Sequence, residues 1–135
     1  MKCDYFLCER NEKMEKEAKS LGFKAFFVKE ISKAEEIQKE EKEKYKQEYD
    51  AVLIKTDCEE ELRRIIDKAS NYFSLIFVLG VTDVINRIAL ESKKVKALVS
   101  PEYQRKYDYT DRRNSGLNHI LCKIAAQNKK AIIIN

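Results

Sequence analysis

The sequence predicts an α/β fold built on a parallel sheet, because short apolar runs alternate with longer charged stretches of helical periodicity. The apolar runs are rich in Val, Ile, Leu and Phe, as expected for strands that are buried on both faces. Short connections between the runs and the helical stretches favour repeated βαβ units. The chain has 135 residues, of which 44% are hydrophobic, so a single folded domain with its own core is expected.

The expected elements follow one another along the chain. The helix expected at 31–48 is dense in Lys and Glu four residues apart and is predicted to be a solvated helix, whereas the one at 117–127 has a clean apolar face. Asp57 precedes the acidic start of one helix, and Thr82 can cap another. Strands are predicted at 3–7, 25–28, 51–54, 75–79, 97–99 and 131–134, and helices at 11–20, 31–48, 59–72, 82–92 and 117–127.

Two architectures fit this order of elements: an open doubly wound sheet, or part of a (β/α) barrel. Periodicity alone does not separate them. The chain ends on the apolar run 131–134, which is predicted to be a strand without a covering helix. We therefore expect 1–135 to be one domain that is truncated at its C-terminal end, with further βα units beyond.

Most chemistry-bearing motifs are missing from the sequence. The glycines Gly22, Gly80 and Gly116 do not form a dinucleotide fingerprint or a phosphate loop, and there is no G-x-S-x-G elbow. His119 is the single histidine, and the four cysteines form no C-x-x-C pair, so we expect no metal site. We expect no catalytic residue and no bound cofactor. The lack of a signal peptide and of a long apolar run favours a cytoplasmic protein that does not contact a membrane.

The charges are distributed unevenly. Residues 1–85 carry 16 Lys/Arg and 19 Asp/Glu, whereas residues 86–135 carry 11 Lys/Arg and 4 Asp/Glu. Such asymmetry points to a surface for a polyanion in the basic half.

The stretch 97–126 is predicted to be a strand, a long polar loop and an amphipathic helix. Ser115 is a plausible N-cap, and Arg112 and Arg113 lie next to the free N–H groups of the helix start, which favour an anion. This loop leaves the carboxyl end of a strand, where function usually lies in βα folds. Asn118 and His119 are expected to order the loop or to contact the same anion. A role for His119 as a catalytic base is not expected, because no second catalytic residue is in sight.

The same stretch resembles a known family. Ser100-Pro101 at the strand end, the turn R-R-N-S-G at 112–116 and the helix L-N-H-I-L-C-K at 117–123 are similar to archaeal and eukaryotic ribonuclease P protein component 3, the thirty-kilodalton-subunit family. Residues 82–87 fit the helix that precedes this strand in that family. The loop 102–111 is longer than the family pattern. It contains tyrosines that could stack on bases or fold back on the barrel.

The resemblance implies an incomplete TIM-like (β/α) barrel of about six parallel strands and five helices. It implies a non-catalytic subunit of ribonuclease P, whose RNA removes the 5′ leader of precursor tRNA with Mg ions bound on the RNA. The expected partners are ribonuclease P RNA, precursor tRNA, ribonuclease P protein component 2 and the other protein subunits. A stand-alone barrel phosphoesterase and an interaction module without an RNA role remain alternatives. The residues expected to bind RNA or a partner are Arg105, Lys106, Arg112, Arg113, Asn114, Ser115, Asn118, His119 and Lys123.

Overall fold

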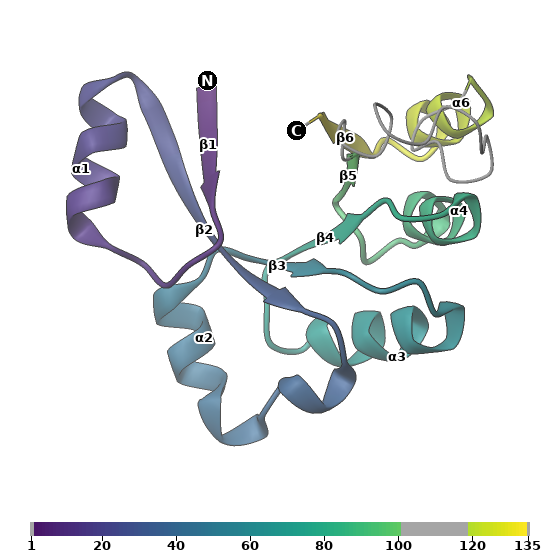
Figure 1. Cartoon of the computed structure of the whole chain (residues 1–135), viewed down its shortest axis with the longest axis horizontal. Coiled ribbons are helices and arrows are strands. Elements are labelled where there is room, and N and C mark those ends of the chain that lie inside the picture. Colours follow the sequence, from purple (N-terminus) through teal and green to yellow (C-terminus); the bar gives the residue numbers. More distant parts are fainter. Residues whose placement is uncertain (1, 101–118, 135) are drawn as a thin grey trace.

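The computed structural model describes residues 2–100 and 119–134, and these form a curled parallel sheet with helices on its outer side (Figure 1). Its strand order follows the sequence, β1-β2-β3-β4-β5-β6, and every pairing is parallel. The strands are β1 (Lys2–Phe6), β2 (Phe23–Ile31), β3 (Ala51–Ile54), β4 (Leu75–Leu79), β5 (Ala97–Ser100) and β6 (Ala131–Ile134). The helices are α1 (Glu12–Ser20), α2 (Lys42–Glu48), α3 (Glu59–Ala69), α4 (Asp83–Glu91) and α6 (His119–Gln127), with 3₁₀ turns η1 (Ala34–Glu36) and η2 (Lys39–Glu41).

The two faces of the sheet are buried in different ways. The outer face packs on the helices, as when Val52 and Ile54 of β3 join Leu62 and Ile65 of α3 in one core. The inner face has a second core made of strand residues, with Leu53 and Phe77 among its members. Since the helices lie on one side and the sheet curls around the other, the fold is a half-barrel and not an open doubly wound sheet. The prediction of an incomplete α/β barrel is confirmed in this form.

Aromatic side chains cross the inner face of the half-barrel. The ring of Tyr5 from β1 stacks on Phe26 of β2 at 5.5 Å between centroids and meets Phe77 of β4 edge-on at 5.6 Å. β1 and β4 are separated by two strands in the sheet, so this contact is made across the curl. It joins the first strand to the fourth over the inner face of the curled sheet.

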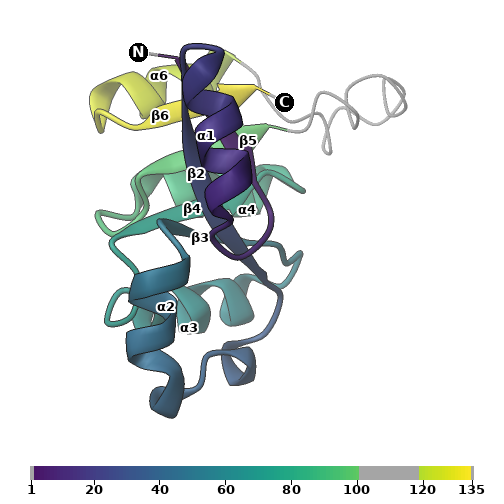
Figure 2. The ribbon, with the colours of Figure 1, turned by 90° about the vertical axis from the view of Figure 1, so that its left-hand side faces the viewer.

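β2 is longer than its neighbours and carries two separate pairings. Residues 23–27 pair with β1, and residues 28–31 pair with β3. Figure 2 shows β2 running the height of this region, with α1 packed in front of it. At the change of partner, Asp50 accepts a hydrogen bond from the buried Phe27 N–H through Oδ2 at 2.9 Å. Arg10 Nη2 lies 2.6 Å from Asp50 Oδ1, and its guanidinium lies over the Phe27 ring.

The helix expected at 31–48 is found only over its last part, where α2 ends at Glu48 as predicted, and the expectation is wrong for residues 31–41. β2 extends to Ile31, and η1, η2 and the short α2 follow it. Hydrogen bonds to side chains replace the helical ladder here: Ala34 N–H donates to Glu61 Oε1 of α3 at 2.8 Å. Gln38 N–H donates to the Tyr45 hydroxyl at 3.0 Å. Burial of Ile37 against the core then fixes a turn where the charge pattern predicts a continuous helix.

The predicted helix starts are found in the structure. Thr82 caps α4, because its hydroxyl accepts from Ile85 N–H at 3.2 Å. The acidic start of α3 after Asp57 is also found, since Glu59, Glu60 and Glu61 form its first turn, and Cys58 holds the N-cap position with no side-chain cap bond. In the described residues, no helix combines the length and the apolar character that a membrane span requires.

Candidate functional site

The carboxyl ends of the strands carry the candidate site, since the loops that precede the helices emerge there. Two acids at this edge, Glu36 and Glu61, are bonded to backbone, whereas Oδ1 of Asp83, the first residue of α4, is buried without a hydrogen-bond partner among the described residues. Glu36 Oε2 accepts from Ser32 N–H at 2.6 Å and from Lys33 N–H at 3.1 Å, which closes the turn after β2. Glu61 Oε1 accepts from Ala34 N–H and so joins that turn to α3. These carboxylates hold the loops in place.

The end of β4 is tightly packed against α4. Gly80 N–H donates to Val99 O of β5 at 2.7 Å. A Cβ atom added at Gly80 would lie 2.5 Å from Oδ1 of Asn86, a polar residue of α4 that is 1% exposed. Gly80 is therefore required by the close approach of α4 to the strand. In the sequence, Gly80 directly follows an apolar run, and this position is one indication of a close approach. No feature of the sequence indicates that Asn86 is buried.

The residues predicted to contact RNA lie mostly beyond what the structure describes. His119 is the first residue of α6, and Lys123 is exposed on the same helix. Ala125, which is 3% exposed, and Ile124 place α6 against the main core, and Asn128 Nδ2 donates to Leu90 O of α4 at 2.9 Å. The residues Arg105, Lys106, Arg112, Arg113, Asn114, Ser115 and Asn118 lie outside the described residues.

The position of α6 is still relevant to the prediction that residues around its start contact RNA. The helix connects the region after β5 to the start of β6, and β5 and β6 are parallel neighbours. In such a crossover the helix runs back along the strands, so its first residue, His119, lies toward their carboxyl ends. The helix start is thus at the edge where the sequence places the phosphate-binding loop.

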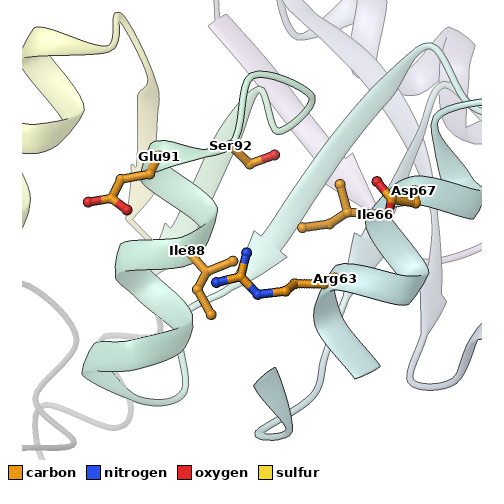
Figure 3. Close-up of a pocket in the computed structure, with 6 residues that line it drawn as sticks. All are labelled: Arg63, Ile66, Asp67, Ile88, Glu91 and Ser92. Carbon is orange, nitrogen blue, oxygen red and sulfur yellow. The ribbon is translucent and has the colours of Figure 1, made fainter. Parts of the chain in front are cut away.

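A shallow groove of about 270 Å³ lies between α3 and α4 on the outer side of the half-barrel (Figure 3). Arg63 extends from α3 toward Ile88 of α4, and Asp67 and Glu91 lie along the two walls. The charges on the walls are mixed, and Arg63 also pairs with Glu59 at 3.3 Å. A polyanion is therefore not expected to bind in this groove.

A strongly basic region lies at the opposite end of the strands. Lys93, Lys94 and Lys96 precede β5, and Lys129 and Lys130 precede β6. The sequence indicates the first three as basic residues of the helix-to-strand turn, but their juxtaposition with the last two follows only from the pairing of β5 with β6.

Over residues 2–100 and 119–134, no three His, Cys, Asp or Glu side chains are grouped so that they could hold a metal ion. The fold and the charge distribution define an α/β protein of the half-barrel type whose C-terminal 50 residues are basic.

The chain is similar to several archaeal proteins named Ribonuclease P protein component 3. It is 35% identical to the protein of Methanothermobacter thermautotrophicus over 81 residues, which cover 60% of this chain and 30% of the relative. It is 35% identical to the protein of Methanocaldococcus jannaschii over 87 residues, 64% of this chain and 34% of the relative. The protein of Methanococcus vannielii is 30% identical over 87 residues, 64% of this chain and 35% of the relative.

The resemblance seen in the sequence motifs is thus confirmed. The chain spans about a third of the length of these curated relatives. No family model matches the chain, and no solved structure matches it.

Proposed function

We propose that this chain acts as, or within, a protein subunit of ribonuclease P and supports the catalytic RNA in removing the 5′ leader of precursor tRNA. The observation that carries the proposal is the similarity over about 60% of the chain to relatives that bear the name of such a subunit. The curled α/β half-barrel supports it, because this is the fold expected from the resemblance. In this proposal the half-barrel is part of a TIM-like barrel in a cytoplasmic ribonucleoprotein.

The protein is proposed to be non-catalytic. Phosphodiester cleavage on a protein needs a positioned base, acid or metal site. At the carboxyl edge, Glu36 and Glu61 are instead bonded to backbone N–H groups. Asp83 has a buried Oδ1, but within the described residues it belongs to no group of three His, Cys, Asp or Glu side chains that could hold a metal ion. The RNA, with its Mg ions, is proposed to supply the chemistry, and ribonuclease P protein component 2 is proposed as the direct protein partner.

The RNA contacts are proposed to lie at the loop before α6 and on that helix. Phosphates favour helix N-termini and neighbouring arginines, since free N–H groups and guanidinium groups both donate to phosphate oxygens. Arg112 and Arg113 are the principal candidates. Further candidates are Arg105, Lys106, Asn114, Ser115, Asn118, His119 and Lys123.

The test is reconstitution. Ribonuclease P would be assembled from the RNA and the other proteins of Methanocaldococcus jannaschii, with this chain in place of component 3, and 5′-leader removal would be measured. We expect this chain to raise the cleavage rate at low Mg and to show no cleavage alone. A failure to stimulate, together with no binding to the component 2 protein or the RNA, would remove the chain from this complex. Leader removal by the purified chain alone, abolished by a mutation in it, would overturn the non-catalytic role.

A further inference from the structure

Five lysines gather where the chain enters β5 and β6, and we refer to Lys93, Lys94, Lys96, Lys129 and Lys130 as the lysine cluster. The sheet register pairs Ala97 with Ala131, so Lys96 and Lys130 are neighbours at the starts of adjacent strands. The backbone confirms their proximity, because Ala131 N–H donates to Lys96 O at 3.2 Å. Two loops that are more than 30 residues apart in the sequence thus place their lysines side by side.

The cluster is held by specific contacts. The ammonium of Lys130 donates to Val95 O at 2.6 Å and ties the two loops together. Lys129 has φ of 55°, a left-handed conformation that costs energy for a residue with a side chain and that glycine adopts more easily. The turn therefore places an exposed lysine at a position where the backbone alone would favour glycine.

Within the described residues, four of the five lysines of the cluster form no ion pair. Lys94 pairs with Asp67 at 3.0 Å, and among the described residues this is the only ion pair that a lysine of the cluster makes. Glu91 is exposed and forms no ion pair with Lys93. Burial lowers the pKa of Lys130 from its ordinary value, and the neighbouring charge of Lys96 lowers it further. The folded chain thus brings like charges together at a cost in free energy that a bound polyanion would offset.

We infer that the lysine cluster is a second contact for the phosphate backbone of RNA, at the end of the half-barrel opposite the carboxyl ends of the strands. The inference rests on the proposed function, which supplies the RNA. Lysines act on phosphates as mobile point charges and do not read bases, so the contact is independent of sequence.

The composition of the surroundings favours RNA over a protein or a membrane. Protein interfaces are centred on buried aromatic or apolar anchors, and membrane-binding surfaces add exposed apolar side chains to their basic residues. The large hydrophobic residues exposed in the described ranges are Tyr5, Leu7, Leu21 and Val84, and none lies in the two loops of the cluster. Charge without an apolar anchor is typical of a phosphate-backbone contact.

The test compares two triple variants that remove the same charge. K93Q/K96Q/K129Q removes the exposed lysines without an ion pair and leaves Lys130 and its hydrogen bond intact. K13Q/K16Q/K19Q removes three exposed lysines of α1 and is the matched control.

Binding to a ribonuclease P RNA transcript and to a precursor tRNA transcript would be measured from 50 to 400 mM salt. The cluster variant is expected to lower the slope of log K against log salt by about 2 and to weaken binding at least ten-fold near physiological salt. The α1 variant is expected to change the slope by less than about 0.5.

The outcomes separate the inference from the proposed function. Retention of the wild-type slope by K93R/K96R/K129R, which keeps the charge, would support a phosphate contact. If K93Q/K96Q/K129Q disturbs folding in thermal unfolding, Lys96→Gln alone is expected to lower the slope by about 0.8. If the wild-type chain binds ribonuclease P RNA and the cluster variants show the same slope of log K against log salt, the inference is overturned and the proposed function stands. Equal wild-type affinity for an unrelated RNA of the same length, still lost in the cluster variant, would support the cluster and count against the proposed function. If the cluster variant binds RNA like the wild-type chain but no longer sediments with vesicles containing 30% phosphatidylserine, the inference is overturned and the cluster is reassigned to a membrane contact.

Discussion

Replacement of Asp50 by alanine tests how the sheet is held where β2 changes partners. The carboxylate has two bonds there: Phe27 N–H donates to Oδ2 at 2.9 Å, and Arg10 Nη2 donates to Oδ1 at 2.6 Å. Asp50 N–H also donates to Phe27 O at 2.7 Å, and alanine keeps that bond. The substitution therefore removes the side-chain contacts without removing the strand pairing itself.

The expected loss follows from the burial of each partner. Phe27 is 0% exposed, so its N–H would be left without an acceptor, at a cost of roughly 1–3 kcal/mol. The side chains of Arg10 and Asp50 are 30% and 28% exposed, so solvent screens their ion pair, which contributes about 0.5–1 kcal/mol. Together these give a loss of roughly 1.5–4 kcal/mol in the free energy of unfolding. For a chain of this length, this corresponds to a fall in Tm of about 5–14 °C.

The assay is urea unfolding followed by circular dichroism. Asp50→Asn keeps an oxygen for the Phe27 N–H and is expected to lose about half as much as Asp50→Ala. The control is Glu9→Ala, because Glu9 and Lys44 form an ion pair at 3.7 Å with side chains that are 57% and 50% exposed. That variant should change stability by less than about 0.5 kcal/mol. An Asp50→Ala variant as stable as Glu9→Ala would refute the conclusion that this carboxylate stabilises β2 where the strand changes partners.

Three further expectations concern the proposed RNA contact, the packing of α4 and the response to alkaline pH. Replacing both Arg112 and Arg113 with alanine should lower the slope of log K for RNA against log salt by roughly 1–2 and change unfolding by no more than about 0.5 kcal/mol. Gly80→Ala should cost roughly 1–3 kcal/mol in chemical unfolding, because its Cβ would meet Asn86 Oδ1 at 2.5 Å, and adding Asn86→Ala should restore part of that loss. Burial is the main cause that raises the pKa of Tyr45, so its native form keeps the proton above the ordinary value of about 10. Stability from this group is therefore full below about pH 10 and is lost as pH rises through the raised pKa, and Tyr45→Phe should flatten that loss in urea titrations between pH 8 and 11.

The buried strands could be predicted from the sequence because each is a short apolar run. β3, β4 and β6 lie where the runs 51–54, 75–79 and 131–134 predict them. β2 is longer than the run 25–28, since its ends include the charged residues Lys24, Lys29 and Glu30. A strand that changes partners along its length has ends that are only partly covered, and hydrophobic runs do not mark such ends.

The structure between β2 and β3 could not be predicted in the same way. Lys and Glu at helical spacing favour a helix locally, but long-range bonds decide the outcome. Tyr45 is 1% exposed, with its hydroxyl accepting from Gln38 N–H, and Glu61 on a later helix accepts from Ala34 N–H. These hydrogen bonds join residues that are separated by 7 and by 27 positions, and such contacts leave no periodic pattern in the sequence.

The candidate site was predictable only in part. The basic half and the helix over α6 follow from charge counts and apolar spacing, whereas the lysine cluster follows from the register of β5 with β6. Asn86 could not be predicted, because a polar residue in a helix is more often on the surface. Its burial depends on the approach of α4 to Gly80.

The two proposed RNA contacts place a constraint on the RNA between them. α6 has nine residues from His119 to Gln127, so with a rise of about 1.5 Å per residue it is about 13 Å long. Arg112 precedes its start in the sequence, and Lys129 and Lys130 of the lysine cluster follow its end. Lys123 lies exposed between them on the same helix. An RNA strand that reaches both ends would pass over Lys123, so Lys123→Gln should weaken binding to the wild-type chain but have little effect once the lysine cluster is removed. Equal and additive effects in both backgrounds would instead indicate that the two ends contact separate RNA segments.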